Sequence, residues 1–473
     1  MIDAKIYFGS SESVASKWSE RYSPYSGEVV SRAPVCDASD AHKALNIAKN
    51  AAVTCKASTL AQRCEWLLDV ARQLRKSREE MAKTITDEVG KPIAFSRVEV
   101  DRCIETITLA AEAMRMMHGE TIATDAMPSG KKTTAFFVRE PVGVVVAITP
   151  FNFPLNLVAH KLAPALVAGN AVVLKPTPEA PLTAYKLARM FIQSEYAIKD
   201  ALSVVYGDAE VGSALVGSDI PRVISFTGSV SVGTIIAKNA GIKKVSLELG
   251  GNAATFIDES ADLDWAAERC ALGAFVNSGQ VCISLQRIYV HAAVYEAFAQ
   301  KIAKATQQLV VGSPYDEHTF MGPLINDESA ERAMGWVQNA IEEGARAMLE
   351  PKREGRMFHP CVMADVTDDM AIVCEEVFAP IVSLVKVEDF DDACPRMNHS
   401  PYGLQFSVFT NSLSLSTRAI DALEAGGIVI NDMPTLRFDI QPYGGVKLSG
   451  VGREGPKFAI EEMTEIKSVF ICS

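Results

Sequence analysis

The spacing of hydrophobic residues changes along the chain, and each change marks a different kind of structure. From residue 40 to about residue 119, apolar side chains recur every three or four positions, which predicts a region of amphipathic helices. One such series is Ala61, Cys64, Leu67, Leu68 and Ala71. Residues 120–140 are β-prone instead, and Gly130 is predicted to lie at a hairpin tip.

After Pro141 the pattern alternates between strands and helices. The predicted strands cover residues 142–148, 171–174, 203–206 and 222–226, and the predicted helices cover residues 155–168, 181–193 and 211–216. Such alternation implies right-handed crossovers and a parallel sheet, so the fold class is α/β. A second alternation spans about 253–430, and residues 465–472 are β-prone. The glycine-rich stretch 443–455 belongs to neither pattern.

The composition narrows the set of expected partners. With 473 residues the chain is long enough for two or three domains. Its net charge of -12 argues against nucleic acid or an anionic membrane surface as the main partner, because both repel an acidic surface. The longest apolar runs, such as 142–148, are shorter than the roughly 20 residues that a membrane-spanning helix needs. The first residues do not resemble a secretory signal.

The ten cysteines form no CxxC pairs and follow no regular spacing, which favours reduced thiols in the cytoplasm and predicts no metal site. Cys64, Cys103 and Cys270 lie in helical patterns and are expected in the core. Cys282 lies in NSGQVCIS, where small residues precede it and apolar residues follow. A cysteine at such a turn can face a cleft as a thiolate nucleophile. A buried packing role is the alternative.

Two further windows contain groups suited to acyl chemistry. Glu248 ends an apolar strand in VSLELGGN, where burial would raise its pKa and suit it to general-base work, unless it turns to solvent. Asn152 lies between two prolines in TPFNFP, which follows another strand. Its carboxamide can donate to a developing oxyanion, or it can cap the following helix.

Glycines at a helix start indicate a phosphate contact. FTGSVSVG, with Gly228, Ser229 and Gly233, follows a strand and opens a helix, so its N–H groups can face a pyrophosphate. It differs from the GxGxxG fingerprint and is weak by itself. Lys175 ends the strand 171–174, at the edge where an open α/β sheet binds its ligand.

Together the windows TPFNFP, AVVLKP, FTGS, LELGG, GQVC, EEVFAP and PYGGVKLSGVGREG resemble the aldehyde dehydrogenase superfamily, from about Tyr7 to Val469. The resemblance implies that Cys282 attacks an aldehyde to give a thiohemiacetal, with Asn152 stabilising the oxyanion. Hydride then leaves to a nicotinamide, and Glu248 activates the water that hydrolyses the thioester. Glu454 resembles a second glutamate on the proton path.

The resemblance also implies a cofactor site for NAD, with NADP as a possible second cofactor. Its predicted residues are Thr149, Pro150, Lys175, Glu179, Gly228, Ser229, Gly233, Glu376 and Phe378. Many family members carry a glutamate three residues after the strand-end lysine, where it excludes a 2′-phosphate. Here Pro178 holds that position and Glu179 follows, and NAD is expected because Glu179 remains close.

Several motifs resemble the branch that includes lactaldehyde, non-phosphorylating glyceraldehyde-3-phosphate and other anionic-aldehyde dehydrogenases. Arg102 and Arg437 are therefore candidates for binding a substrate anion, since the arginine fork matches an anionic oxygen group. Arg102 has an alternative as a surface charge paired with Glu99 or Glu105. Val281 is apolar where phosphate-specific relatives carry another arginine, so a small hydroxy- or anionic aldehyde is favoured over glyceraldehyde 3-phosphate.

The resemblance further implies three parts. Residues 1–119 and 141–250 are expected to form a modified Rossmann NAD(P)-binding domain, and residues 251–447 a second α/β catalytic domain. Residues 120–140 and 448–473 are expected to form a small β oligomerisation flap in a homodimer or homotetramer. Two other functions remain: a CoA-acylating dehydrogenase, which an intact Glu248 disfavours, and a catalytically silent structural or binding relative.

Overall fold

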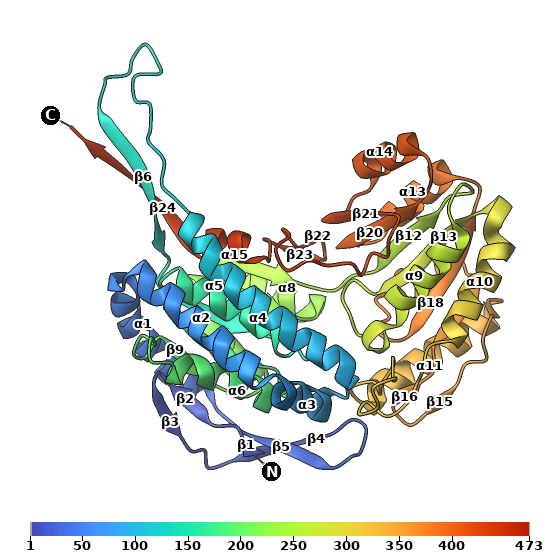
Figure 1. Ribbon diagram of the computed structural model, residues 1–473, viewed down its shortest axis with the longest axis horizontal. Helices are drawn as coiled ribbons and strands as arrows, with labels where there is room; N and C mark the ends of the chain where they lie inside the picture. Colours follow the sequence, from blue (N-terminus) through green and yellow to red (C-terminus); the bar gives the residue numbers. More distant parts are fainter. Residues whose placement is uncertain (1, 473) are drawn as a thin grey trace.

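The computed structural model describes residues 2–472 as two α/β bodies side by side, with a two-stranded ribbon projecting from the first (Figure 1). The first body contains an eight-stranded sheet in the order β23-β11-β10-β7-β8-β9-β2-β3. Its central strands are parallel, and β23, β2 and β3 join antiparallel at the ends. The strands are β2 (Ile6–Phe8), β3 (Ser11–Ser13), β7 (Val144–Ile148), β8 (Ala171–Lys175), β9 (Leu202–Val204), β10 (Val223–Thr227), β11 (Lys244–Glu248) and β23 (Gly450–Val451).

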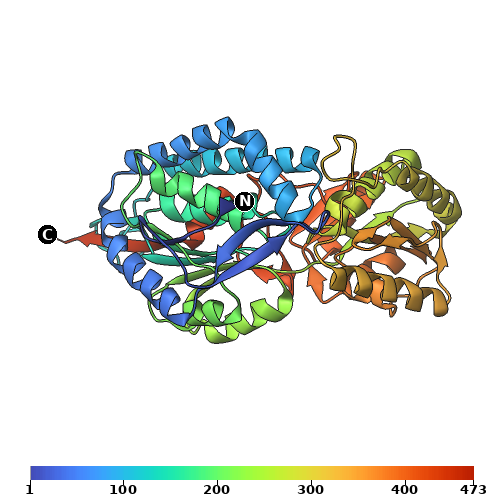
Figure 2. The ribbon, with the colours of Figure 1, turned by 90° about the horizontal axis from the view of Figure 1, so that it is seen from below.

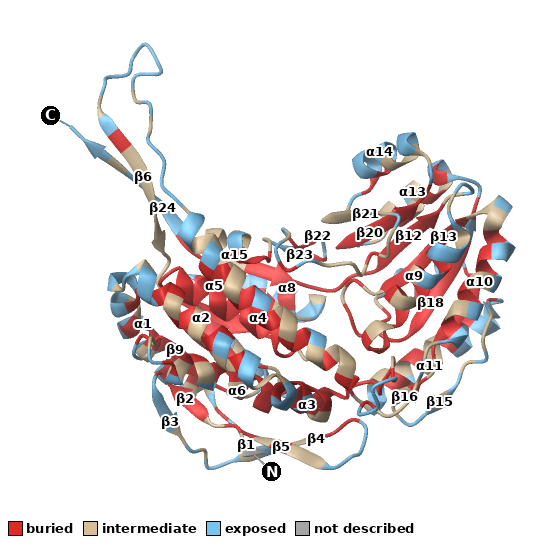
Figure 3. Ribbon diagram, in the orientation of Figure 1, coloured by how far each residue is buried: buried red, intermediate tan, exposed pale blue. Residues whose placement is uncertain are grey.

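Helices cover both faces of this sheet (Figure 2). One layer contains α2 (Leu60–Lys76), α3 (Arg78–Val89), α4 (Ile93–Met116), α5 (Asn156–Val167), α6 (Pro181–Gln193) and α15 (Pro456–Glu462), and the other contains α1 (Ala38–Ala57), α7 (Ala209–Gly217) and α8 (Val230–Asn239). Because both faces are covered, every residue of β7 and β8 is buried, which explains why their sequences are apolar up to Lys175 at the end of β8. In Figure 3 the buried residues fill the interior of both bodies, and the exposed residues lie toward the outside.

The second body contains a seven-stranded sheet in the order β14-β17-β18-β13-β12-β20-β21. Its strands are β12 (Ala253–Ile257), β13 (Leu285–His291), β14 (Arg346–Ala347), β17 (Cys361–Ala364), β18 (Ile381–Val387), β20 (Gln405–Phe409) and β21 (Gly427–Ile430). Its helices are α9 (Leu263–Phe275), α10 (Tyr295–Gln307), α11 (Asp327–Glu342), α12 (Ala371–Cys374), α13 (Phe390–Asn398) and α14 (Leu413–Ala422). The α/β class and the parallel sheets that the sequence predicts are confirmed.

Smaller sheets of two or three strands complete the fold. They comprise β1 (Ile2–Asp3) and β4 (Trp18–Tyr22) on either side of β5 (Val29–Pro34), β15 (Arg353–Glu354) with β16 (Met357–Phe358), and β19 (Tyr402–Gly403) with β22 (Val446–Lys447). The projecting ribbon pairs β6 (Thr134–Pro141) with β24 (Thr464–Ile471) in antiparallel register. Thus the β-prone tail pairs with the β-prone stretch before Pro141. Among the described residues, no helix is both long and apolar enough to cross a membrane.

Residues 448–472, the part of the C-terminal segment that the structure describes, contribute to both the first body and the ribbon. Gly450 and Val451 form β23 on the edge of the first sheet, and α15 packs against α4 and α5. Only β24 reaches the ribbon. The order of apolar and polar residues could not predict β23, because two residues are too few to show the alternation typical of a strand.

Candidate active site

Two cavities meet at Cys282. The larger has a volume of about 1140 Å³ and lies at the carboxyl ends of β7, β8 and β10, the edge where a parallel sheet ordinarily binds its ligand. The smaller, about 310 Å³, lies between α4 and loops of the second body. Cys282 and Asn152 line both cavities. Ligands in the two cavities can therefore meet at this thiol.

A strained turn places Cys282 at this junction. Residues 277–279 are all left-handed, with φ values of 51°, 56° and 72°. The last is a glycine, and a Cβ there would lie 2.3 Å from the carbonyl oxygen of Ala379. Ser278 Oγ donates to the carbonyl oxygen of Gly322 at 2.8 Å, which helps to offset the strain of a non-glycine residue in this conformation.

The Cys282 thiol lies 2.9 Å from the hydroxyl oxygen of Tyr443. Although part of the residue faces the cavities, its depth in the protein raises the pKa of Cys282 to about 11. The bond to Tyr443 and the positive charge of Arg437 oppose that shift. The thiol is therefore the resting form at neutral pH, and thiolate formation needs stabilisation.

Asn152 directs its amide toward the segment that carries the thiol. Its Nδ2 donates to the carbonyl oxygen of Gln280 at 3.0 Å, and its Oδ1 accepts from the Phe153 N–H at 3.1 Å. The alternative role as a helix cap falls to Glu99 of α4, which accepts from the Asn156 N–H at 3.2 Å at the start of α5.

Two buried glutamates lie close enough to influence each other's ionisation, and their surroundings push their pKa values apart. Burial and the negative charge of Glu454 raise the pKa of Glu248, whose carboxylate oxygens have no hydrogen-bond partner within residues 2–472. Glu454 accepts from Lys161 Nζ and Arg437 Nη2, each at 3.1 Å. Although burial opposes ionisation, Lys161, His160 and Arg437 lower the pKa of Glu454 to about 2. Glu248 lines neither cavity, so its side chain must rotate to reach a ligand.

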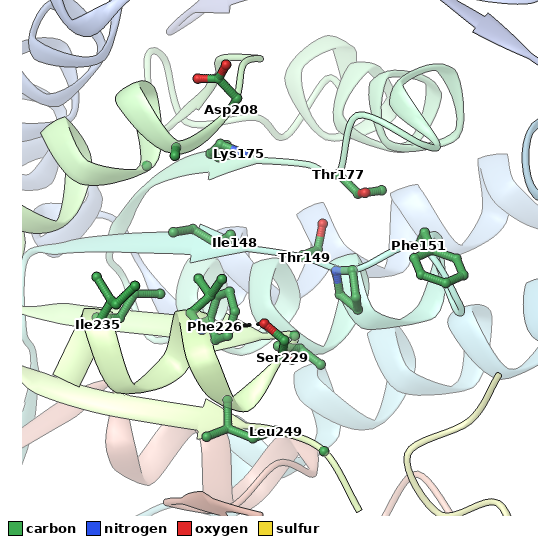
Figure 4. Close-up of a pocket in the computed structure, with 18 of the residues that line it drawn as sticks. Ile148, Thr149, Phe151, Lys175, Thr177, Asp208, Phe226, Ser229, Ile235 and Leu249 are labelled. Atoms are coloured by element: carbon green, nitrogen blue, oxygen red, sulfur yellow. Dashed lines mark hydrogen bonds between the residues drawn. The ribbon is translucent and has the colours of Figure 1, made fainter. Parts of the chain in front are cut away.

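The loops after β7 and β10 supply polar atoms to the larger cavity (Figure 4). The hydroxyl groups of Thr149 and Thr227 are buried there with no hydrogen-bond partner among the described residues, so a polar ligand would satisfy them. Pro150 forms part of the wall, and Gly228 and Ser229 lead into α8. The start of this helix favours an anion through its N–H groups. These features fit a dinucleotide with a pyrophosphate.

Lys175 and Asp208 also line this cavity (Figure 4). Burial lowers the pKa of Lys175, and the negative charges of Asp208 and Glu179 oppose the shift. Glu179 itself does not line the cavity, since Pro178 forms the wall and the Glu179 carboxylate faces Arg21 Nη1 at 3.9 Å. Its charge nevertheless acts on Lys175 of the lining, so a contact of Glu179 with the cofactor stays a prediction.

Of the other predicted cofactor residues, two line the larger cavity and one does not. Glu376 and Phe378 line the larger cavity. Burial raises the pKa of Glu376 to about 7, although its Oε1 accepts from the Gly251 N–H at 3.0 Å. Gly233 is outside the lining, and a Cβ there would lie 2.4 Å from Leu249 Cδ2. Close packing of α8 against Leu249 explains a glycine at this position, and contact with the cavity does not.

Arg102 and Arg437 line the smaller cavity, but each is already paired with a buried carboxylate. Arg102 donates through Nε and Nη2 to Asp439, both at 2.8 Å, rather than to a glutamate of its own helix. Arg437 donates to Glu454. The pair with Asp439 leaves Nη1 of Arg102 for another acceptor. Val281 lines this cavity as an apolar residue.

Sequence reasoning did not assign several residues at this junction. Lys91 forms a fully buried ion pair with Glu99, and its ammonium lies 3.9 Å from the ring centroid of Phe153. Asp439 also accepts from His160 Nε2 at 2.9 Å. In the sequence, such a residue shows only as a charged position among apolar neighbours. A single sequence does not identify the distant residue with which it pairs.

Three comparisons describe what the chain is similar to. Residues 10–469 match the sequence model of the Aldehyde dehydrogenase family. The 3-sulfolactaldehyde dehydrogenase of Priestia aryabhattai is 43% identical over 98% of this chain and 96% of its own length. The structure of aldehyde dehydrogenase 21 from Physcomitrella patens with the reaction product succinate has a TM-score of 0.97 at 36% identity, covering 99% and 98% of the two chains. The NADP complex of the NADP-dependent glyceraldehyde-3-phosphate dehydrogenase from Bacillus halodurans also has a TM-score of 0.97, at 32% identity and 100% and 99% coverage.

The substitution Thr227→Val tests whether the unpartnered hydroxyl serves a ligand. We expect NAD(P)⁺ to bind about 3- to 10-fold more weakly, because one hydrogen bond contributes about 0.5–1.5 kcal/mol. The protein should remain as stable as the wild type, since this hydroxyl has no partner among the described residues. Calorimetric titration and thermal unfolding measure the two quantities.

The matched control is Thr255→Val, because Thr255 Oγ1 is hydrogen-bonded to Ser407 Oγ at 2.7 Å and lines neither cavity. This control should lose stability and keep its affinity for the cofactor. Unchanged affinity together with lost stability in Thr227→Val would show that the Thr227 hydroxyl is structural.

Proposed function

Because the chain belongs to the aldehyde dehydrogenase family, we propose that it oxidises a small hydroxy- or anionic aldehyde to the carboxylic acid with NAD(P)⁺. The observation that carries this proposal is the place of Cys282, which lines both the larger cavity for the dinucleotide and the smaller cavity for the aldehyde. A nucleophile that borders both sites can hold the aldehyde where its hydride can pass to the dinucleotide.

In the proposed reaction, the Cys282 thiolate bonds to the aldehyde carbon and the carbonyl electron pair moves to oxygen. The Asn152 amide, now donating to the carbonyl of Gln280, is the donor for this oxyanion. Bound NAD(P)⁺ supplies the acceptor for the hydride from the same carbon, which leaves a thioester on Cys282. Water then displaces the thiolate and releases the acid.

Glu248 is the proposed base for the water. Burial raises the pKa of the Glu248 carboxyl, and this makes its carboxylate a stronger base toward water. Glu454 stays ionised between Lys161 and Arg437. A fixed negative charge beside Glu248 increases its basicity, and this is how we propose that Glu454 contributes to the proton path.

The proposed substrate carries an anion or hydroxyl group that meets Arg102 in the smaller cavity. The similar proteins described above are named for sulfolactaldehyde or glyceraldehyde 3-phosphate, or contain succinate, and each of these molecules carries an anionic group. Nη1 of Arg102 takes no part in the pair with Asp439 and can donate to the substrate. Arg437 lies in the same wall of the cavity. Because Asp439 already neutralises much of the Arg102 charge, the site suits a small monoanion or a hydroxyl better than a dianion such as phosphate. The apolar Val281 supports the same preference.

For the cofactor, we propose that Lys175 contacts the adenosine ribose, Gly228 and Ser229 the pyrophosphate, and Glu376 and Phe378 the nicotinamide ribose. Lys175 and Asp208 supply one charge of each sign at their end of the cavity. NAD⁺ is the proposed preference, since Asp208 there opposes the extra charge of a 2′-phosphate.

We further propose that the protein assembles as a homodimer or homotetramer through the ribbon of β6 and β24, whose exposed apolar side chains include Ile466, Phe470 and Ile471. All ten cysteines are free thiols, which supports a reducing compartment such as the cytoplasm. The proposed cofactor domain comprises residues 1–119 and 141–250, and the proposed catalytic domain comprises residues 251–447.

The substitution Glu248→Gln tests the hydrolytic step. Glutamine cannot take a proton from water, so the acyl-enzyme should accumulate. We expect a rapid burst of about one NAD(P)H per site, followed by a steady rate about 10²- to 10⁴-fold below that of the wild type. Stopped-flow absorbance measures both phases, and wild-type protein should release free acid in the absence of coenzyme A.

Two controls accompany this experiment. The exposed Glu259→Gln should react like the wild type, and Cys282→Ala should give no burst while still binding the cofactor. A full steady rate in Glu248→Gln would contradict its role as the base. Strict dependence of the wild type on coenzyme A would instead identify a CoA-acylating enzyme.

The substitution Arg102→Ala tests the substrate class. We expect KM for a carboxylate-bearing aldehyde to rise about 10- to 100-fold, because a hydrogen bond to a charged group contributes about 1.5–3 kcal/mol. KM for the neutral amide of the same aldehyde should change much less. The control Arg97→Ala removes a half-buried arginine of the same helix that pairs with Glu79 and Glu317. Equal effects of Arg102→Ala on both aldehydes would make this arginine structural.

A further inference from the structure

Tyr443 holds its hydroxyl against the sulfur of Cys282. The two atoms are 2.9 Å apart, and the ring is only 3% exposed in the wall of the smaller cavity. Two backbone hydrogen bonds with Glu454 anchor the residue, at 3.0 Å from the Tyr443 N–H and at 2.6 Å to its carbonyl oxygen. The guanidinium carbon of Arg437 lies 3.7 Å from the ring centroid. The phenol is thus fixed both by its backbone and by its ring.

We propose that Tyr443 is a catalytic residue whose hydroxyl donates a hydrogen bond to the Cys282 thiolate, and that Arg437 strengthens this donor through the ring. The inference rests on the proposed role of Cys282 as the nucleophile. It adds a group that acts on the sulfur itself, whereas Asn152 acts on the carbonyl oxygen of the substrate.

The bond favours the charged form of the thiol. A hydrogen bond to an ionised acceptor is about twice as strong as one between neutral groups, so an O–H donor stabilises the thiolate more than the thiol. A cation on the face of the ring draws electron density from the phenol and makes its O–H a better donor. Burial also raises the pKa of Tyr443, which keeps the donor protonated.

The carboxyl groups near the thiol oppose this stabilisation. Glu248 from the end of β11 and Glu376 from the loop before β18 both disfavour the thiolate when they are ionised. Tyr443 and Arg437, from the loop after β21, favour it. The balance between burial and these two side chains therefore sets how much thiolate is present at neutral pH.

The same donor serves both chemical steps. During attack, the thiolate electron pair forms the C–S bond, and the charge passes to the carbonyl oxygen. During hydrolysis, water bonds to the acyl carbon, its proton passes to Glu248, and the C–S bond breaks with its electron pair returning to sulfur. The Tyr443 hydroxyl stabilises the sulfur charge before the first step and after the second, and Tyr443 neither gains nor loses a proton.

The test is the pH dependence of alkylation of Cys282 by iodoacetamide, without aldehyde or cofactor, in the wild type and in Tyr443→Phe. Peptide mass spectrometry follows Cys282 separately from the other thiols. We expect alkylation at neutral pH to be about 2- to 4-fold slower in Tyr443→Phe, because the thiolate is scarcer although each thiolate is more nucleophilic. The curve of Cys282 alkylation rate against pH should move by about 0.5–1 pH unit toward higher pH. Arg437→Gln, a second variant, should move the profile in the same direction.

The controls separate this effect from packing. Cys374 is exposed and should react equally in every variant, and Tyr295→Phe removes a buried hydroxyl that lines neither cavity and should keep the wild-type profile. A profile of Tyr443→Phe that superimposes on the wild type would overturn the inference. Failure of the proposed function has a different signature, namely turnover by Cys282→Ala.

Discussion

Burial of ionisable groups around one thiol is the constraint on which the site depends. Cys282 has to lie deep enough to meet ligands from two cavities, and that depth raises its pKa to about 11. The same burial would make any unpaired charge nearby costly. Four ion pairs accordingly lie near the thiol and the smaller cavity, namely Lys91–Glu99, Arg102–Asp439, Arg437–Glu454 and Lys161–Glu454. Among the described residues Glu248 has no such partner, and burial raises its pKa.

Two of these pairs, Arg102–Asp439 and Arg437–Glu454, depend on a C-terminal loop that returns from the second body to the first. The loop carries Arg437, Asp439 and Tyr443, and it ends at β23 on the edge of the first sheet. Gly450 permits that return, since a Cβ there would lie 2.0 Å from the carbonyl oxygen of Leu247. The loop therefore links the two bodies and also supplies one partner to each of two buried ion pairs.

The local part of this arrangement could be predicted from the sequence. The parallel strands are continuous apolar runs, and Cys282 and Asn152 stand out in motifs at loops next to strands or helices. Glu179 shows the limit, because the direction of its side chain depends on the turn after Pro178, which is not encoded in a periodic pattern. Asp439 and Tyr443 could not be assigned for a similar reason, since their partners Arg102 and Cys282 are far away in the sequence.

The central claim is that the acyl group of the substrate passes through Cys282. The most direct measurement is peptide mass spectrometry on wild-type protein that has been mixed with aldehyde and NAD(P)⁺ and quenched with acid within the first turnover. The account predicts that the Cys282 peptide gains the mass of the acyl group in proportion to the NAD(P)H formed. Formation of NAD(P)H with an unmodified Cys282 peptide, or with the acyl group on another residue, would contradict it.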